Sequence, residues 1–207
     1  MILISGAPLS GKTELLRQMA VSIQENNPDI HLSVLLLGGR AEDVPAMRRA
    51  VTRGEVTYSS EREDAENHVR AASAAVERAK RLVEMGEDVV VLINGLSLLA
   101  AACDEVAARR TFGLSFWVRA KALFGAGRNI EFGGSLTIIG TASDRMDADA
   151  ACVLSEISTT VIRLTPSLVE ASRFLRADCI PVIDTERSWS HHRELLVRPI
   201  IPQQARA

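Results

Sequence analysis

Eight residues near the amino terminus have the types and spacing of a phosphate-binding loop. Gly6 and Gly11 are separated by four residues, and Lys12 and Thr13 follow directly. The glycines allow the backbone to curl so that successive N–H groups face phosphate oxygens, and a helix that follows points its positive end at the same anion. Lys12 would reach the β- and γ-phosphates, and the Thr13 hydroxyl would ligate Mg²⁺. The pattern predicts a P-loop (residues 6–13) that holds ATP or ADP.

The residues expected to contact the nucleotide belong to this loop and to the first helical turn after it. They are Pro8, Leu9, Ser10, Gly11, Lys12, Thr13 and Glu14. A match at all four fixed positions of this motif is expected by chance in about one chain in a hundred. An ordinary glycine-rich turn is therefore the alternative. The place of the motif, between an apolar stretch at 1–5 and a helical pattern at 12–25, favours the P-loop.

Short apolar runs alternate with longer amphipathic stretches, which favours an α/β fold with a mainly parallel sheet and helices on both faces. Strands are expected at residues 1–5, 31–37, 55–58, 88–93, 135–141, 159–165 and 181–184, and helices at 12–25, 41–53, 62–85 and 116–125. The stretch 145–158 is interpreted as holding a loop. One domain is expected over 1–198, with a loose tail at 199–207.

The composition narrows the class of protein. Hydrophobic residues make up 47% and charged residues 24%, as in globular domains, and a net charge of −2 excludes a general polycation but not a local basic groove. Cys103, Cys152 and Cys179 are odd in number and widely spaced, so buried free thiols are expected. No apolar run approaches the roughly 20 residues of a membrane span. We therefore expect a cytoplasmic protein without membrane association.

Beyond the P-loop, the chain resembles the ATPase domain of the bacterial transcription termination factor Rho, a RecA-like P-loop NTPase. The resemblance is strongest over residues 123–141, LFGAGRNIEFGGSLTIIGT, which are similar nearly residue for residue to a family segment along a core strand. Further matches fall in family order at 27–29, 77–84, 181–184 and 194–196. The family is a homohexameric, ATP-driven RNA translocase with each ATP site between two subunits. The resemblance thus implies a RecA-like fold, ATP, RNA and an oligomeric ring.

The same resemblance shows that groups needed for hydrolysis are replaced. A family strand ends in Asp-Glu-Arg, whose Glu positions the attacking water; here the strand ends in Gly38-Gly39-Arg40, and Gly39 cannot orient water. The family Asp that helps to hold Mg²⁺ aligns with Asn94, which keeps an oxygen but loses the charge. The arginine finger aligns with His191, and a neutral imidazole substitutes poorly for a permanent cation. The chain is interpreted as a shortened and catalytically diverged member.

Substitutes for the lost groups are available nearby in the sequence. Glu42 and Asp43 lie just beyond Gly39, although acids at the start of a helix are also explained by the helix dipole. Arg187 aligns with a separate family arginine, and Arg193 lies two residues after the finger position. Neither arginine is preferred as a replacement for the finger.

The parts that would contact RNA are reduced. The chain begins at the strand before the P-loop, so a separate amino-terminal RNA-binding domain is not expected. The channel loop corresponds to a shorter stretch at about 104–114 that contains Arg109 and Arg110, and Arg145 keeps a cation at the second channel loop. These three arginines are the candidate nucleic-acid contacts, and a solvated surface is the alternative. The adenine-facing aromatic of the family falls near Ile180.

Three functions remain open. The first is a Rho-like ATP-binding protein with weak or lost hydrolysis, in effect a helicase-like pseudoenzyme, in which Thr13 ligates Mg²⁺ and Asn94 does so weakly. The second is an active ATP-dependent RNA helicase or translocase in transcription termination that uses substitute residues. The third is a scaffold that needs no nucleotide. A scaffold has no physical need of Lys12 and Thr13 at this spacing, which argues against the third.

Overall fold

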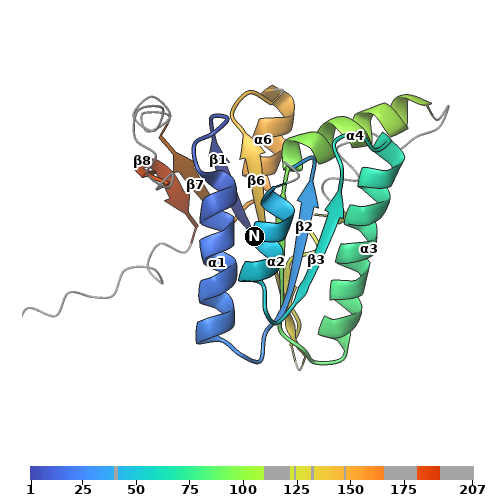
Figure 1. The fold of residues 1–207 in the computed structure, drawn as a ribbon, viewed down its shortest axis with the longest axis vertical. Helices are drawn as coiled ribbons and strands as arrows, with labels where there is room; N and C mark the ends of the chain where they lie inside the picture. Colours follow the sequence, from blue (N-terminus) through green and yellow to red (C-terminus); the bar gives the residue numbers. More distant parts are fainter. Residues whose placement is uncertain are drawn as a thin grey trace, which may run out of the picture.

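The apolar runs form the strands of one sheet in a computed structural model, which describes residues 1–39, 42–109, 122–123, 125–131, 133–146, 148–165 and 181–191. The sheet has the strand order β3-β2-β4-β6-β1-β7-β8, with β5 paired to β6. Figure 1 shows β7 and β8 on one side of the sheet and β2 and β3 on the other. The strands are β1 Ile2–Gly6, β2 His31–Leu37, β3 Glu55–Ser59, β4 Val89–Asn94, β5 Arg128–Asn129, β6 Ser135–Ser143, β7 Thr160–Leu164 and β8 Ile183–Ser190. All neighbours from β3 to β7 along this order are parallel, whereas β5 and β8 pair antiparallel.

Helices cover both faces of the sheet, as the sequence predicts. They are α1 Lys12–Asn26, α2 Asp43–Ala50, α3 Ala65–Glu84, α4 Leu96–Arg109 and α6 Ala148–Glu156. One core contains Val34 and Leu36 of β2 together with residues of α1 and α2. The other contains Leu35 and Leu37 with residues of α3, α4 and α6. Successive residues of a strand point to opposite faces, so a strand buried on both faces is apolar throughout.

Most of the predicted strands and helices are confirmed, with small shifts at their ends. The strand at 31–37 has the predicted bounds, and the long helix predicted at 62–85 is the shorter α3. β8 continues to Ser190 instead of ending at 184. The predicted helix at 116–125 falls almost entirely outside the described residues, and the predicted tail at 199–207 falls wholly outside them.

Two predicted loops were wrong in part. The stretch taken as a shortened channel loop begins inside α4, whose buried Leu96, Leu99, Cys103 and Val106 have the three- and four-residue spacing of a helix. The stretch 145–158 contains α6, because its many alanines are strong helix formers and because Leu154 is buried. Small residues were therefore a poor indicator of a loop here.

The thiol prediction is confirmed at one position and wrong at another. Cys103 is buried and Cys152 is exposed on α6, and neither is in a disulfide within the described residues; the Cys152 Sγ lies 3.7 Å from Glu156 Oε1. Cys179 lies outside the described residues. Within the described part of the chain, no helix combines the length and apolar character needed to cross a membrane.

Candidate nucleotide-binding site

The ends of four parallel strands bring the predicted site residues to one edge of the sheet. β1 ends at the P-loop, and its Gly6 pairs with Ser143 at the end of β6. Asn94 at the end of β4 pairs with Leu36 of β2 on one side and with Thr141 of β6 on the other. In open α/β sheets ligands bind outside the carboxyl ends of the strands. The topology therefore collects the P-loop, Asn94 and Gly39, which follows β2, in the place where a ligand is expected.

The P-loop has the backbone conformation of an anion-binding loop. Leu9 and Gly11 have φ values of 65° and 89°, in the left-handed region. Gly11 is the N-cap of α1 and makes no side-chain hydrogen bond to the helix, so this cap supplies no acceptor for the first-turn N–H groups. A Cβ on Gly11 would also approach Pro181 Cβ to 3.2 Å. Conformation and space both favour glycine here, and the helix end is open to an anion.

Lys12 extends back over the loop. Its Nζ donates to the carbonyl oxygens of Gly6 at 2.8 Å and Ala7 at 2.6 Å. Partial burial lowers the pKa of this amine, and the nearby Asp144 carboxylate opposes that shift. The Asp144 N–H donates to Gly6 O at 3.2 Å, which ties the end of β6 to the loop. A bound phosphate would give the ammonium an anionic acceptor in place of neutral carbonyl groups.

Two cavities border the junction of the P-loop and α1. The first, of about 310 Å³, is lined on the helix side by Leu9, Gly11, Glu14 and Arg17 and by residues of α2. The second, of about 330 Å³, is lined at the strand ends by residues that include Gly39, Glu61, Asn94 and Thr141. Lys12, Thr13 and Asp43 line both cavities. Each cavity has the size of a small-ligand site.

Pro8 and Ser10, two of the predicted contacts, line neither of these cavities. Ser10 is only 4% exposed, and its N–H donates to Ala7 O. Its hydroxyl has no hydrogen-bond partner among the described residues and lies 2.7 Å from the position of a Cβ on Gly6. The Ser10 side chain therefore packs against Gly6 inside the loop. Glu14 is the last of the predicted contacts, and a hydrogen bond from Arg17 lowers its pKa.

Asn94 is 8% exposed and is held in a polar chain of contacts. Its Oδ1 accepts a hydrogen bond of 2.6 Å from the Thr141 hydroxyl, which itself accepts one from the Gly95 N–H at 3.1 Å. Its Nδ2 donates to Thr13 Oγ1 at 3.3 Å. The oxygen that the sequence suggested as a weak Mg²⁺ ligand is thus engaged with Thr141, and the N–H₂ group faces the predicted metal ligand Thr13.

Gly39 has room for a side chain. A Cβ there would have Asp43 Oδ2 at 3.8 Å and Asn94 Nδ2 at 4.0 Å as its nearest neighbours. The Gly39 carbonyl accepts a hydrogen bond of 3.3 Å from the Tyr58 hydroxyl. Neither left-handed backbone nor crowding requires glycine at this position, so the absence of a carboxylate comes from the residue type alone.

The two described candidates for nucleic-acid contact lie on different elements. Arg109 is in the last turn of α4 and is ion-paired with Glu105. Arg145 is exposed in the turn after β6, where its N–H donates to Ser143 Oγ at 3.2 Å. Arg110 lies outside the described residues. One of the two described arginines is therefore already paired with an acidic neighbour.

The position of the arginine finger lies at the end of β8. His191 is exposed, its N–H donates to Thr159 O at 2.8 Å, and its ring meets Trp189 edge-on at 4.9 Å between centroids. His191 and Arg187 line neither of the two cavities that border the P-loop. Arg193 and Ile180 lie outside the described residues.

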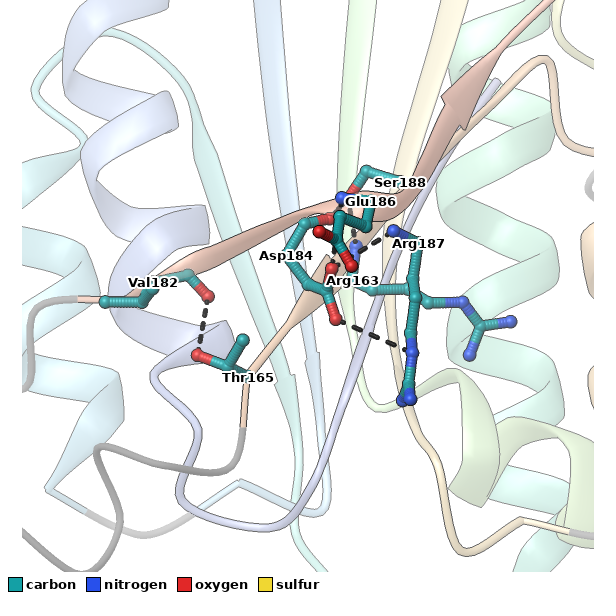
Figure 2. Close-up of polar contacts among 7 residues, drawn as sticks. All are labelled: Arg163, Thr165, Val182, Asp184, Glu186, Arg187 and Ser188. Atoms are coloured by element: carbon teal, nitrogen blue, oxygen red, sulfur yellow. Dashed lines mark hydrogen bonds and ion pairs between the residues drawn. The ribbon is translucent and has the colours of Figure 1, made fainter.

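Arg187 projects from an irregularity in β8 (Figure 2). The Asp184 carboxylate accepts the N–H groups of Glu186 at 3.1 Å and Arg187 at 3.0 Å, and the Ser188 hydroxyl donates to Asp184 O at 2.5 Å. The Arg163 N–H in turn donates to Ser188 Oγ at 3.0 Å. Bulges of this kind redirect side chains, and the Arg187 side chain is 78% exposed.

Sequence reasoning missed two residues of the site and undervalued a third. Thr141 and Glu61 were not singled out, and Asp43 was interpreted mainly as a helix-start acid. Thr141 lies near the end of β6 and Glu61 lies shortly after β3. Both residues lie at the end of a predicted strand or a few residues beyond it. This position was the signal that could have identified them from the sequence.

Comparisons with known proteins agree with the geometry of the site. No family model matches the chain. Transcription termination factor Rho of Micrococcus luteus is 39% identical over 205 residues, which cover 94% of this chain and 29% of the relative. Rho of Streptosporangium roseum is 37% identical over 95% of this chain and 52% of its own length, and Rho of Buchnera aphidicola is 39% identical over 95% and 48%.

Solved structures with the same arrangement are ATPases. An ATPase from the type III secretion system of pathogenic bacteria has a TM-score of 0.77 at 21% identity and covers 96% of this chain and 58% of that one. The ATPase EscN of enteropathogenic E. coli has a TM-score of 0.73 at 21% identity, over 92% and 47%. At this identity the likeness concerns the fold.

The chain spans about half or less of the length of these Rho relatives. The resemblance first seen at residues 123–141 is confirmed over nearly all of the chain, and the P-loop follows β1 as predicted. This chain is therefore a relative of transcription termination factor Rho with the RecA-like fold of the P-loop ATPases.

Proposed function

We propose that this chain binds ATP or ADP at the P-loop and hydrolyses ATP weakly or not at all. The observation that carries the proposal is the hydrogen bonding of the P-loop and of the start of α1. The amino-terminal end of α1 has no side-chain cap. Within the described part of the chain, the Lys12 ammonium beside it donates hydrogen bonds to the carbonyl oxygens of Gly6 and Ala7. Both features favour an anion, and two cavities adjoin them.

The residues fit a phosphate group better than they fit Mg²⁺. Phosphate would receive backbone N–H groups and the Lys12 ammonium, neither of which depends on the residues that have diverged. A hard cation prefers oxygen ligands, carboxylates above all. At this site Thr13 instead receives the N–H₂ group of Asn94. We therefore propose that nucleotide binding depends little on Mg²⁺.

Weak hydrolysis follows from three replaced groups. Gly39 supplies no carboxylate to orient water, Asn94 supplies no negative charge, and His191 stands where the family has its arginine finger. An arginine finger alone is worth about 10³–10⁵ in rate. Binding is less affected, because the P-loop is complete.

A second candidate is an active, RNA-stimulated ATPase that acts in transcription termination as part of an oligomeric ring. It is favoured by the name and the 37–39% identity of the Rho relatives. The ion pair of Arg109 with Glu105 speaks against a strong RNA contact at that position. We rank it second for that reason and because of the replaced groups.

The experiment is a calorimetric titration with ATP and with ADP, each with and without Mg²⁺. We expect the chain to bind both nucleotides, with affinities that change by less than about threefold on adding Mg²⁺. Lys12→Ala should weaken binding by at least about tenfold, because it removes a charge-assisted contact to phosphate. Lys80→Ala on α3, which removes a lysine paired with Glu77, is the matched control and should bind normally.

A turnover assay on the same samples separates the alternatives. An unmodified chain that binds neither nucleotide would overturn the proposal and favour a scaffold. Phosphate release that RNA raises far above the level of Lys12→Ala would favour the RNA-stimulated ATPase. Light scattering at the same concentrations tests the oligomer.

A further inference from the structure

The carboxylate of Asp43 lies near position 39, where the chain has a glycine and so no carboxylate of its own. Asp43 Oδ2 is 3.8 Å from the position of a Cβ on Gly39. Standard bond lengths put the carboxylate oxygens of a glutamate roughly 3–4 Å from its Cβ. The oxygen of Asp43 is therefore at about the distance from position 39 that the missing oxygen would have.

Asp43 also stands where the phosphate-binding residues converge. It is the first residue of α2 and is half-buried. It lines both cavities, and so do Lys12 and Thr13. A phosphate held by these two residues would have the Asp43 carboxylate on the wall of the same space.

Two neighbouring acids are placed less favourably. Glu42 is exposed and lines neither cavity. Glu61, after β3, lines the cavity at the strand ends, and its Cβ lies 3.9 Å from the position of a Cβ on Gly38. It does not line the cavity on the helix side. The geometry thus favours Asp43 over both.

We propose that Asp43 orients the attacking water in the slow hydrolysis of ATP by this chain, in place of the carboxylate absent from position 39. The inference rests on the proposed nucleotide binding. An ionised aspartate acts only as a hydrogen-bond acceptor, which is the role that positioning a water requires.

The hydrolysis step requires only water and ATP as reactants. The water oxygen bonds to the terminal phosphorus while the bond from that phosphorus to the bridging oxygen breaks, and ADP leaves with the electron pair. The Asp43 carboxylate accepts a hydrogen bond from the water and takes its proton, which then passes to solvent. Inorganic phosphate and ADP are the products.

The test compares single-turnover phosphate release of the unmodified chain with that of Asp43→Asn and Glu42→Gln. Asp43→Asn should release phosphate at least about tenfold more slowly, because a general base contributes about 10²–10⁴ in rate. Its ATP affinity by calorimetry should stay within about twofold of normal. Glu42→Gln removes one charge from the adjacent residue and should release phosphate at the normal rate, which controls for charge at the start of α2.

A second variant separates this role from a structural one. Position 39 has room for a side chain, so Gly39→Glu in the Asp43→Asn background should restore release. A merely structural loss at Asp43 would lower the urea midpoint and would not be repaired at position 39.

The inference is overturned if Asp43→Asn releases phosphate at the normal rate, if only Glu61→Gln slows release, or if the unmodified chain releases no more than Lys12→Ala. In each of these cases normal ATP binding leaves the proposed function standing. Absence of ATP binding by the unmodified chain would overturn the proposed function as well.

Discussion

The side-chain amide of Asn94 donates a hydrogen bond of 3.3 Å to the hydroxyl of Thr13. In P-loop proteins the hydroxyl at this position ligates Mg²⁺. Thr141 holds the amide from the other side through its 2.6 Å bond to Asn94 Oδ1. At position 94 the site therefore turns an N–H₂ donor, and not a carboxylate, toward the place of the metal.

Asn94→Asp should make nucleotide binding depend on Mg²⁺. Aspartate has nearly the same shape, can still accept the hydrogen bond from Thr141, and gives the metal a charged oxygen in place of an N–H₂ group. We expect Mg²⁺ to raise the ATP affinity of this variant by about tenfold, which corresponds to about 1.4 kcal/mol. Calorimetric titration with and without Mg²⁺ measures the ratio.

Asn129→Asp, on the exposed strand β5, makes the same chemical change away from the site. Its Mg²⁺ dependence should match that of the unmodified chain. Equal ratios for Asn94→Asp and Asn129→Asp would show that the amide does not limit metal binding.

Lys12 should make the stability of the nucleotide-free protein depend on alkaline pH. Burial lowers its pKa in the folded protein, so within the window between that lowered pKa and the ordinary value of about 10.4 the unfolded chain binds more protons than the folded one. Stability therefore rises with pH through this window, and the cost of burying the charge persists below it. Lys12→Met should flatten this rise.

Urea midpoints measured from about pH 8 to about pH 10.5 give the comparison. Lys80→Met, which removes a lysine from the surface of α3, should retain the slope of the unmodified chain. The same slope in Lys12→Met would contradict the predicted cost of burial.

The hydrogen bonds of the Gln24 side chain should stabilise the packing of α1 against α2. It is 8% exposed; its Nε2 donates to Ala20 O at 2.8 Å and Ala50 O at 3.2 Å, and its Oε1 accepts the Arg53 N–H at 2.8 Å. Gln24→Ala leaves these backbone groups without the side chain and should lower the free energy of unfolding by about 1–3 kcal/mol. Urea denaturation measures the change.

Gln18 provides the control on the same helix. It is exposed and bonds only to the Glu14 side chain among the contacts described. Gln18→Ala should change stability by no more than about 0.5 kcal/mol. A loss from Gln24→Ala as small as this would mean that water replaces the lost contacts.

Asp184 should hold the irregular part of β8 in place. Its carboxylate accepts two backbone N–H groups, and removing the acceptors in Asp184→Ala should speed hydrogen exchange of the Glu186 and Arg187 amides. The exposed neighbour in Glu186→Ala should leave the Arg187 amide as protected as before. Unchanged exchange in Asp184→Ala would assign the shape of this segment to its backbone pairing with β7.

The sequence by itself determined the P-loop and most of the sheet. Glycine spacing and apolar runs involve only a few neighbouring residues, so the spacing of Gly6, Gly11 and Lys12 identifies the P-loop. For the same reason β2 at His31–Leu37 has its predicted bounds. The loss of a carboxylate at Gly39 and of a charge at Asn94 was also visible, because residue type alone decides it.

The tertiary structure decided how the remaining side chains face one another. Asn94 and Thr13 are 81 residues apart in the chain, and which end of the amide meets the hydroxyl depends on Thr141 of a third segment. Asp43 was ambiguous in sequence because a helix-start acid and a site carboxylate look the same there. Its place beside Gly39 and Lys12 arises only when α2 and the strand ends meet, since contacts between distant segments are set by packing and not by local spacing.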